Sequence, residues 1–108
     1  MSATIGDMSN KMDKTIEVAD PFARKLMARY LERRINDLEV LELALAESDF
    51  ETICLTGHNL YGSGSAYGLD EISRLGKGLE KAAESEDAGQ IRAQLGDLAT
   101  FVRTVKIR

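Results

Sequence analysis

Apolar residues recur at spacings of three and four from Phe22 to Val105, and this helical period is what most constrains how the chain can fold. Such spacing gathers the apolar side chains on one face of each helix, and that face must pack against another. The single proline, Pro21, stands at the start of the periodic region and not inside it. Alanine, leucine and charged helix formers are plentiful, while tryptophan is absent. The 108-residue chain therefore predicts one all-α domain.

Caps and breaks divide the periodic region into five expected helices. Asp20 and Pro21 form a helix start, with an N-cap aspartate and a proline at the first helical position. The apolar stripe shifts phase near residues 33–36, which predicts a break between a first and a second helix. Ser48-Asp49 precedes a third helix, a fourth begins near Asp70, and residues 85–87 separate it from a fifth. The stripe residues, helix by helix, are Phe22, Leu26, Met27, Tyr30 and Leu31; Ile35, Leu38, Leu41 and Leu45; Phe50, Ile53, Cys54, Gly57, Leu60, Tyr61, Gly64 and Tyr67; Ile72, Leu75, Leu79, Ala82 and Ala83; Ile91, Leu95, Leu98, Phe101, Val102 and Val105.

Short connections between amphipathic helices predict an antiparallel up-down four-helix bundle with an additional N-terminal helix. Residues 1–19 are polar with sparse apolar positions and are expected to form a flexible leader, so the bundle domain would span residues 20–108. The net charge of −4, with basic residues scattered among acidic ones, argues against a nucleic-acid partner. No apolar run reaches the roughly 18–20 residues of a membrane span, and one cysteine cannot form an internal disulfide. We therefore expect a cytoplasmic monomer without a membrane partner.

His58, the only histidine, opens the run HNLYGSGSAYG over residues 58–68. Gly57, Gly62 and Gly64 surround it, and each glycine inside a helix costs roughly 0.5–1 kcal/mol relative to alanine. This cost indicates that bare backbone is needed beside the imidazole. Local propensity at residues 62–65 favours a loop, but the apolar spacing on both sides predicts a continuous helix that ends at Gly68 as its C′ residue.

Several interpretations of this region are possible from its residues. A lone histidine at the edge of an apolar stripe is most often a polar surface residue. One histidine and one inward cysteine, Cys54, cannot supply a structural metal shell, so no metal site is expected. The inward position of Cys54 and the lack of an oxyanion device argue against a nucleophilic hydrolase. The glycine run has no preceding strand and no following Lys-Ser/Thr, which excludes a phosphate-binding loop.

Residues 57–68 resemble the signature segment of histidine-containing phosphotransfer (HPt) domains. That segment has an apolar residue two positions after the histidine, a glycine four positions after it, and an apolar–glycine pair that ends ten positions after it. Leu60, Gly62, Tyr67 and Gly68 occupy these positions. The similarity extends from residue 20 to the C-terminus, through the start at residues 20–21, residues 44–49 and residues 75–87.

The resemblance implies that neutral His58 accepts a phosphoryl group on Nε2 from the aspartyl phosphate of a response-regulator receiver domain and passes it to another receiver. A hybrid sensor kinase would supply the phosphoryl group. The resemblance implies no ATP site, no kinase activity and no cofactor in this chain, with Mg²⁺ expected on the partner receiver. Glu80 matches an acidic position that orients the histidine through Nδ1 in some relatives, and a solvated carboxylate is the alternative.

The resemblance also implies a docking face around the histidine. Gly62 would leave room for the imidazole and for the receiver, and three neighbours are expected to contact the receiver, namely Leu55, Asn59 and Ala66.

Two positions depart from the family pattern. The residue three after the histidine is typically lysine and is Tyr61 here, and the often basic next residue is Asn59. Lys77, Arg74 or Lys81 on the next helix could supply the missing positive charge. Tyr61 leaves two other interpretations open: a non-catalytic HPt-like module that binds a receiver or kinase without transfer, and a helical adaptor in which His58 is incidental.

Overall fold

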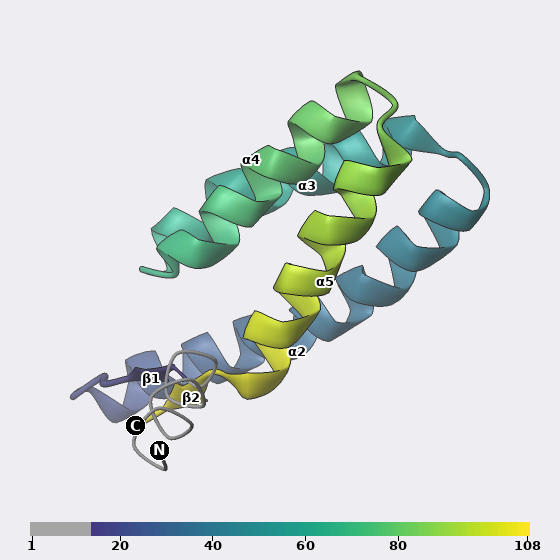
Figure 1. Ribbon diagram of the computed structural model, residues 1–108. Helices are drawn as coiled ribbons and strands as arrows, with labels where there is room; N and C mark the ends of the chain where they lie inside the picture. Colours follow the sequence, from purple (N-terminus) through teal and green to yellow (C-terminus); the bar gives the residue numbers. More distant parts are fainter. Residues whose placement is uncertain (1–13) are drawn as a thin grey trace, which may run out of the picture.

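The computed structural model describes residues 14–108, which form four helices and two short strands. The helices are α2 (Pro21–Ala46), α3 (Phe50–Ala66), α4 (Asp70–Glu84) and α5 (Ala88–Thr104). The strands are β1 (Thr15–Ile16) and β2 (Lys106–Ile107). The chain turns back on itself after α2, α3 and α4 (Figure 1). The prediction of an all-helical domain is confirmed.

Aspartate caps begin three of the four helices. The side chains of Asp20, Asp49 and Asp87 accept hydrogen bonds from the backbone amides two or three residues later. These bonds satisfy amide groups that have no partner inside the helix. The structure confirms the predicted helix starts at residues 20–21, 49 and 70. It also confirms the break at residues 85–87.

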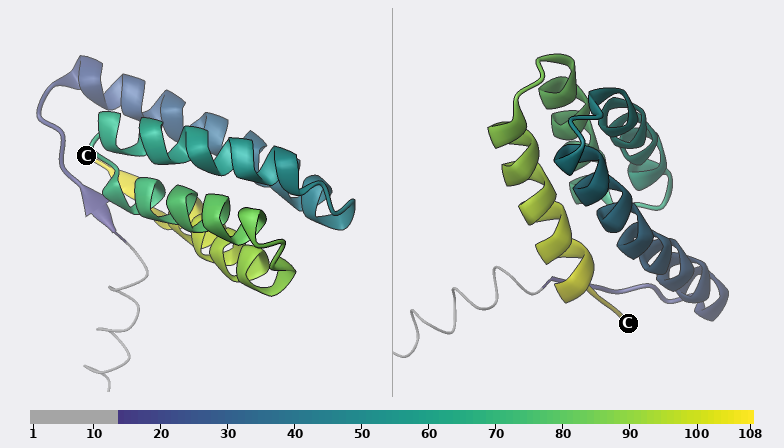
Figure 2. Two further views of the ribbon diagram at one scale, coloured as in Figure 1. Left: turned by 90° about the horizontal axis from the view of Figure 1, so that it is seen from above. Right: turned by 90° about the vertical axis from the view of Figure 1, so that its right-hand side faces the viewer.

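The helices enclose one apolar core. Each helix packs against its neighbours in the chain, and α2 packs against α5. The pair α3 and α4 shares the most extensive contact and lies side by side (Figure 2). The largest fully buried side chains come from all four helices and the α3–α4 turn: Leu38, Leu41, Ile53, Leu60, Leu69, Ile72, Leu75, Leu79, Ile91 and Leu98.

The predicted break near residues 33–36 is wrong, because α2 is one continuous helix of 26 residues. Arg34 interrupts the apolar stripe without interrupting the helix. Its guanidinium lies 4.1 Å from the centroid of the Tyr30 ring, and its Nε lies 2.9 Å from Oδ2 of Asp37. The aromatic face and the carboxylate allow a cation to occupy this half-buried position. The two helices expected before residue 47 are thus one, and residues 14–108 contain no additional N-terminal helix.

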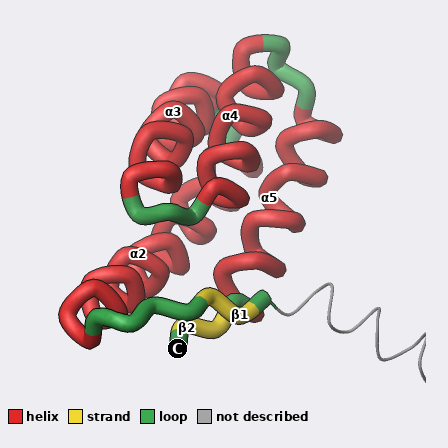
Figure 3. Tube along the Cα trace, turned by 90° about the vertical axis from the view of Figure 1, so that its left-hand side faces the viewer, coloured by secondary structure: helices red, strands yellow, loops and turns green. Residues whose placement is uncertain are grey.

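Four stripe residues are more exposed than their spacing suggested. Phe22 and Leu26 are 67% and 40% exposed, because the start of α2 extends past α3 and α4 (Figure 3). Tyr61 is 45% exposed on the surface of α3. Tyr67 is 38% exposed but stacks on Tyr30, with the ring centroids 4.2 Å apart.

The glycine-containing segment of α3 is helical, as predicted from the apolar spacing. The helix continues through residues 62–65, and Gly68 follows its C-cap with a φ of +75°. The amides of Gly68 and Leu69 donate to the carbonyls of Ser65 and Gly64 at 2.9 and 2.8 Å. This pair of bonds is the Schellman arrangement, whose left-handed residue favours glycine.

Close packing explains two of the glycines that were expected to serve the imidazole. A Cβ on Gly57 would lie 2.7 Å from the carbonyl oxygen of Gly76, and one on Gly64 would lie 2.6 Å from the amide nitrogen of Ser73. Both neighbours are backbone atoms of α4. Gly57 and Gly64 therefore let the two backbones approach closely, and of the three glycines around His58 only Gly62 faces open space.

The two chain ends of the described region pair with each other. Strands β1 and β2 are parallel, with Thr15 opposite Lys106 and Ile16 opposite Ile107 (Figure 3). The amide of Val18 also donates to the carbonyl of Arg108 at 2.6 Å. This pairing involves the last part of the expected leader and was not predicted from the sequence. The rest of that leader, residues 1–13, lies outside the described residues.

Candidate functional site

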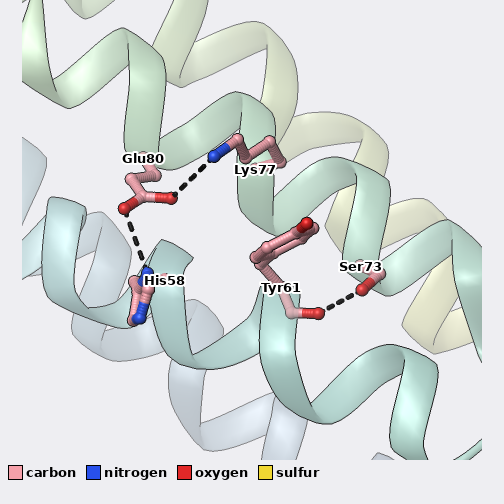
Figure 4. A network of polar contacts seen from close by, with 5 residues as sticks. All are labelled: His58, Tyr61, Ser73, Lys77 and Glu80. Atoms are coloured by element: carbon pink, nitrogen blue, oxygen red, sulfur yellow. Dashed lines mark hydrogen bonds and ion pairs between the residues drawn. The ribbon is translucent and has the colours of Figure 1, made fainter.

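His58 stands on the exposed side of α3 and contacts a carboxylate from α4. Its side chain is 64% exposed, and Nδ1 lies 3.1 Å from Oε2 of Glu80 (Figure 4). The Glu80 side chain is only 15% exposed. A Cβ on Gly57 would lie 2.7 Å from the Glu80 amide nitrogen, so the glycine contact brings α4 near enough for Glu80 to reach the imidazole.

This contact decides which ring nitrogen carries the proton. An ionised carboxylate can only accept hydrogen bonds, so Nδ1 of His58 must donate to it. In the neutral ring the other nitrogen, Nε2, then keeps its lone pair. Figure 4 shows that Nε2 points away from Glu80. The geometry thus presents a nucleophilic nitrogen at the surface of the helix pair.

Lys77 and Tyr61 extend this network across the α3–α4 surface. The Nζ atom of Lys77 lies 3.7 Å from Oε1 of Glu80 and 5.0 Å from the centroid of the Tyr61 ring. The carbonyl of Tyr61 accepts a hydrogen bond from the buried hydroxyl of Ser73 (Figure 4). The ring of Tyr61, predicted to face the core, instead lies over the surface beside Lys77.

Of the three cations considered on α4, Lys77 is the one that the structure brings to the His58–Glu80 pair. Arg74 is engaged with Glu71, with Nη2 and Oε2 2.6 Å apart. This hydrogen bond lowers the pKa of Glu71 and raises that of Arg74. Lys81 is exposed one turn further along α4.

The expected docking residues lie on the exposed surface of α3. Gly62 is exposed, and a Cβ added there would have no heavy atom within 4 Å outside its own stretch of helix. Leu55 is 62% exposed, and Asn59 and Ala66 are also exposed. Leu55 precedes His58 by three residues and Gly62 follows it by four, so both flank the imidazole on one helix face. Their part in receiver binding stays a prediction.

The structure also gathers Cys54, Glu80 and Glu84, each of which offers one atom within 4.8 Å of the others. Sequence spacing did not indicate this group, because its members come from two helices. Burial raises the pKa of the Cys54 thiol, and the nearby Glu84 and Glu80 raise it further. The expectation of no metal site stays a prediction.

Within residues 14–108, no helix combines the length and the apolar character that a bilayer span requires. A protein-family model described as Hpt domain matches residues 25–104, which include all of α3, α4 and α5 and most of α2. Comparisons with curated proteins and with solved structures gave no match.

Proposed function

The chain belongs to the Hpt domain family, whose members carry phosphoryl groups on histidine in phosphorelays, and we propose that His58 is its phospho-accepting residue. The observation that carries this proposal is the contact of Nδ1 with Glu80 at 3.1 Å, which leaves Nε2 of the exposed ring free. We also propose that the four helices of this chain have the antiparallel up-down topology of the family's bundle.

In the proposed step, the Nε2 lone pair of His58 attacks the phosphorus of an aspartyl phosphate on a receiver domain. The Nε2–P bond forms while the P–O bond to the aspartate breaks, and the electron pair of that bond leaves on the aspartate carboxylate. The Nδ1 proton stays in the hydrogen bond to Glu80, whose charge offsets the positive charge that develops on the ring. The reverse reaction passes the phosphoryl group to a second receiver.

The partners in this proposal are response-regulator receivers and a hybrid sensor kinase that supplies the phosphoryl group. Phosphoryl transfer depends mainly on positioning and charge stabilisation, which the Mg²⁺ of the receiver would provide. This chain then needs no metal or nucleotide of its own. A monomer in the cytoplasm is part of the proposal, and the free thiol of Cys54 is compatible with that compartment.

The open surface at Gly62 supports a docking role for this face of α3. A receiver must bring its phosphorylated aspartate to Nε2, so its surface has to approach the helix turns on either side of His58. The empty space above Gly62 and the exposed apolar side chain of Leu55 suit such an approach. Asn59 and Ala66 would line the same contact.

The proposal is tested by incubating the chain with a receiver domain phosphorylated by acetyl phosphate. We expect a label on the chain that is labile in acid and stable in alkali, as a phosphoramidate is. His58→Gln should take no label and should keep its fold, because substitutions at exposed sites usually change stability by about 0.5 kcal/mol or less. A label on folded His58→Gln protein would identify another acceptor and refute the proposal.

A second candidate is a non-catalytic module that binds a receiver or kinase without transfer. Tyr61 in place of the family's lysine favours it. The same incubation separates the two candidates: the non-catalytic module would bind the receiver in a pull-down and gain no label.

A further inference from the structure

Phosphorylation of His58 would concentrate negative charge at one point of the α3–α4 surface. A phosphoryl group carries about −1.5 to −2 charges near neutral pH and three acceptor oxygens. Glu80, already in contact with the imidazole, adds another negative charge. In water-exposed surroundings this repulsion is moderate, but a nearby cation would reduce it.

Lys77 is the cation of α4 that an ion pair joins to Glu80. Its Nζ is 3.7 Å from the same carboxylate that holds the imidazole. Arg74, on the preceding turn of α4, is already paired with Glu71. Lys77 is 46% exposed, so its ammonium can reach a group that extends from the surface.

Glu80 and Tyr61 attract the ammonium of Lys77 but leave its N–H donors available. A separation of 3.7 Å from Glu80 exceeds hydrogen-bond distance, and Oε1 of Glu80 has no hydrogen-bond partner. The Tyr61 ring, at 5.0 Å, attracts the charge through its π face. The three N–H donors of Lys77 can therefore turn to a stronger acceptor. Phosphoryl oxygens are such acceptors.

We propose that Lys77, held over the ring of Tyr61, binds the phosphoryl oxygens of phosphorylated His58, so that α4 supplies the cation that α3 lacks. This inference rests on the proposed function. Tyr61 is a positioning residue, because it keeps the flexible lysine stem on the His58 side of α4. The hydrogen bond from the Ser73 hydroxyl to the Tyr61 carbonyl joins this turn of α3 to α4.

The test uses the full chain and potassium phosphoramidate, a small donor that requires no partner protein. Its P–N bond breaks as the Nε2–P bond forms, and ammonia leaves. ³¹P NMR then follows the titration of the phosphoryl group on His58 with pH. Removing a nearby cation disfavours the dianion, so Lys77→Met should raise the titration midpoint by as much as about 0.7 pH unit. Lys25→Met is the matched control, since Lys25 is an exposed lysine on α2, and it should leave the midpoint unchanged.

Two further variants test the part of Tyr61. Tyr61→Leu should shift the midpoint in the same direction as Lys77→Met, by a smaller amount. Adding Tyr61→Lys to Lys77→Met should restore the midpoint of the parent, because the cation is then carried by α3. If Tyr61→Leu titrates like the parent, Tyr61 does not position Lys77 and that part of the inference is wrong.

The outcomes separate this inference from the proposed function. If His58 takes no label either from phosphoramidate or from the phosphorylated receiver, both fail. If the label forms and Lys77→Met titrates like the parent, the inference is wrong and the proposed function stands. Equal shifts in Lys77→Met and Lys25→Met would show a general effect of net charge and would also overturn the inference.

Discussion

Replacing Gly62 with alanine adds one methyl group beside His58 and touches nothing else in the bundle. A Cβ at this position has no heavy atom within 4 Å outside its own stretch of helix. The variant should therefore gain the helix propensity of alanine over glycine, about 0.5–1 kcal/mol. For a domain of this size 1 kcal/mol corresponds to about 4–8 °C, so Tm should rise by about 2–8 °C.

Gly64→Ala is the matched control, with the same substitution two residues later in the same helix. Its Cβ would lie 2.6 Å from the amide nitrogen of Ser73 and 3.0 Å from the carbonyl oxygen of Leu69. Because both are backbone atoms, α3 and α4 would have to move apart. Overpacking of this kind costs about 1–3 kcal/mol, which exceeds the gain in helix propensity. We expect Tm to fall.

Stability and transfer should change in opposite directions at Gly62. If this glycine keeps the surface clear for the receiver, Gly62→Ala should slow transfer, and the larger Gly62→Gln should slow it more. Thermal melts by circular dichroism and transfer rates from a phosphorylated receiver, measured on the same preparations, decide the matter. A Gly62→Gln protein that transfers as fast as the parent would refute the clearance argument. A lower Tm for Gly62→Ala would refute the open environment on which it depends.

Three further predictions concern charges around the site and at the start of α3. Glu80→Gln keeps an acceptor for Nδ1 of His58 but removes its charge, so the transfer rate should fall by up to about fivefold in a stopped-time labelling assay. Hydrogen bonds from Thr52 lower the pKa of Asp49 below its ordinary value of 3.8, so its contribution to stability is present above that pH and is lost as the pH falls below it. In acid-unfolding curves, Asp49→Asn should weaken this dependence. Burial raises the pKa of the Cys54 thiol above 9.0, so alkylation by iodoacetamide should be slower at pH 8 in the folded than in the urea-unfolded protein.

The positions of the helices follow from local features of the chain. N-cap aspartates, the start at Pro21 and the left-handed Gly68 act on their own neighbours, so they could be recognised in the sequence and are found at the helix ends. The apolar period overrode the loop propensity of residues 62–65, because burial of α3 against α4 outweighs the cost of two helical glycines. The exposed position of His58 followed from the same period.

Contacts between helices decided what the period could not. The phase shift at residues 33–36 was interpreted as a break, but the helix continues because Tyr30 and Asp37 accommodate a half-buried Arg34. The spacing of apolar residues cannot predict stacking of this kind. Gly57 and Gly64 were expected to leave space beside the imidazole. Instead, the backbone of α4 occupies the space of their missing side chains.

The sequence by itself determined the helical class, the helix ends marked by caps and the identity of the one exposed imidazole. Only the tertiary structure brought Glu80 to Nδ1, placed Lys77 over the ring of Tyr61 and left Gly62 open. The physical reason is distance along the chain. Periods and caps depend on residues within one or two turns, while the side chains that hold His58 come from α4, where close glycine packing sets their reach.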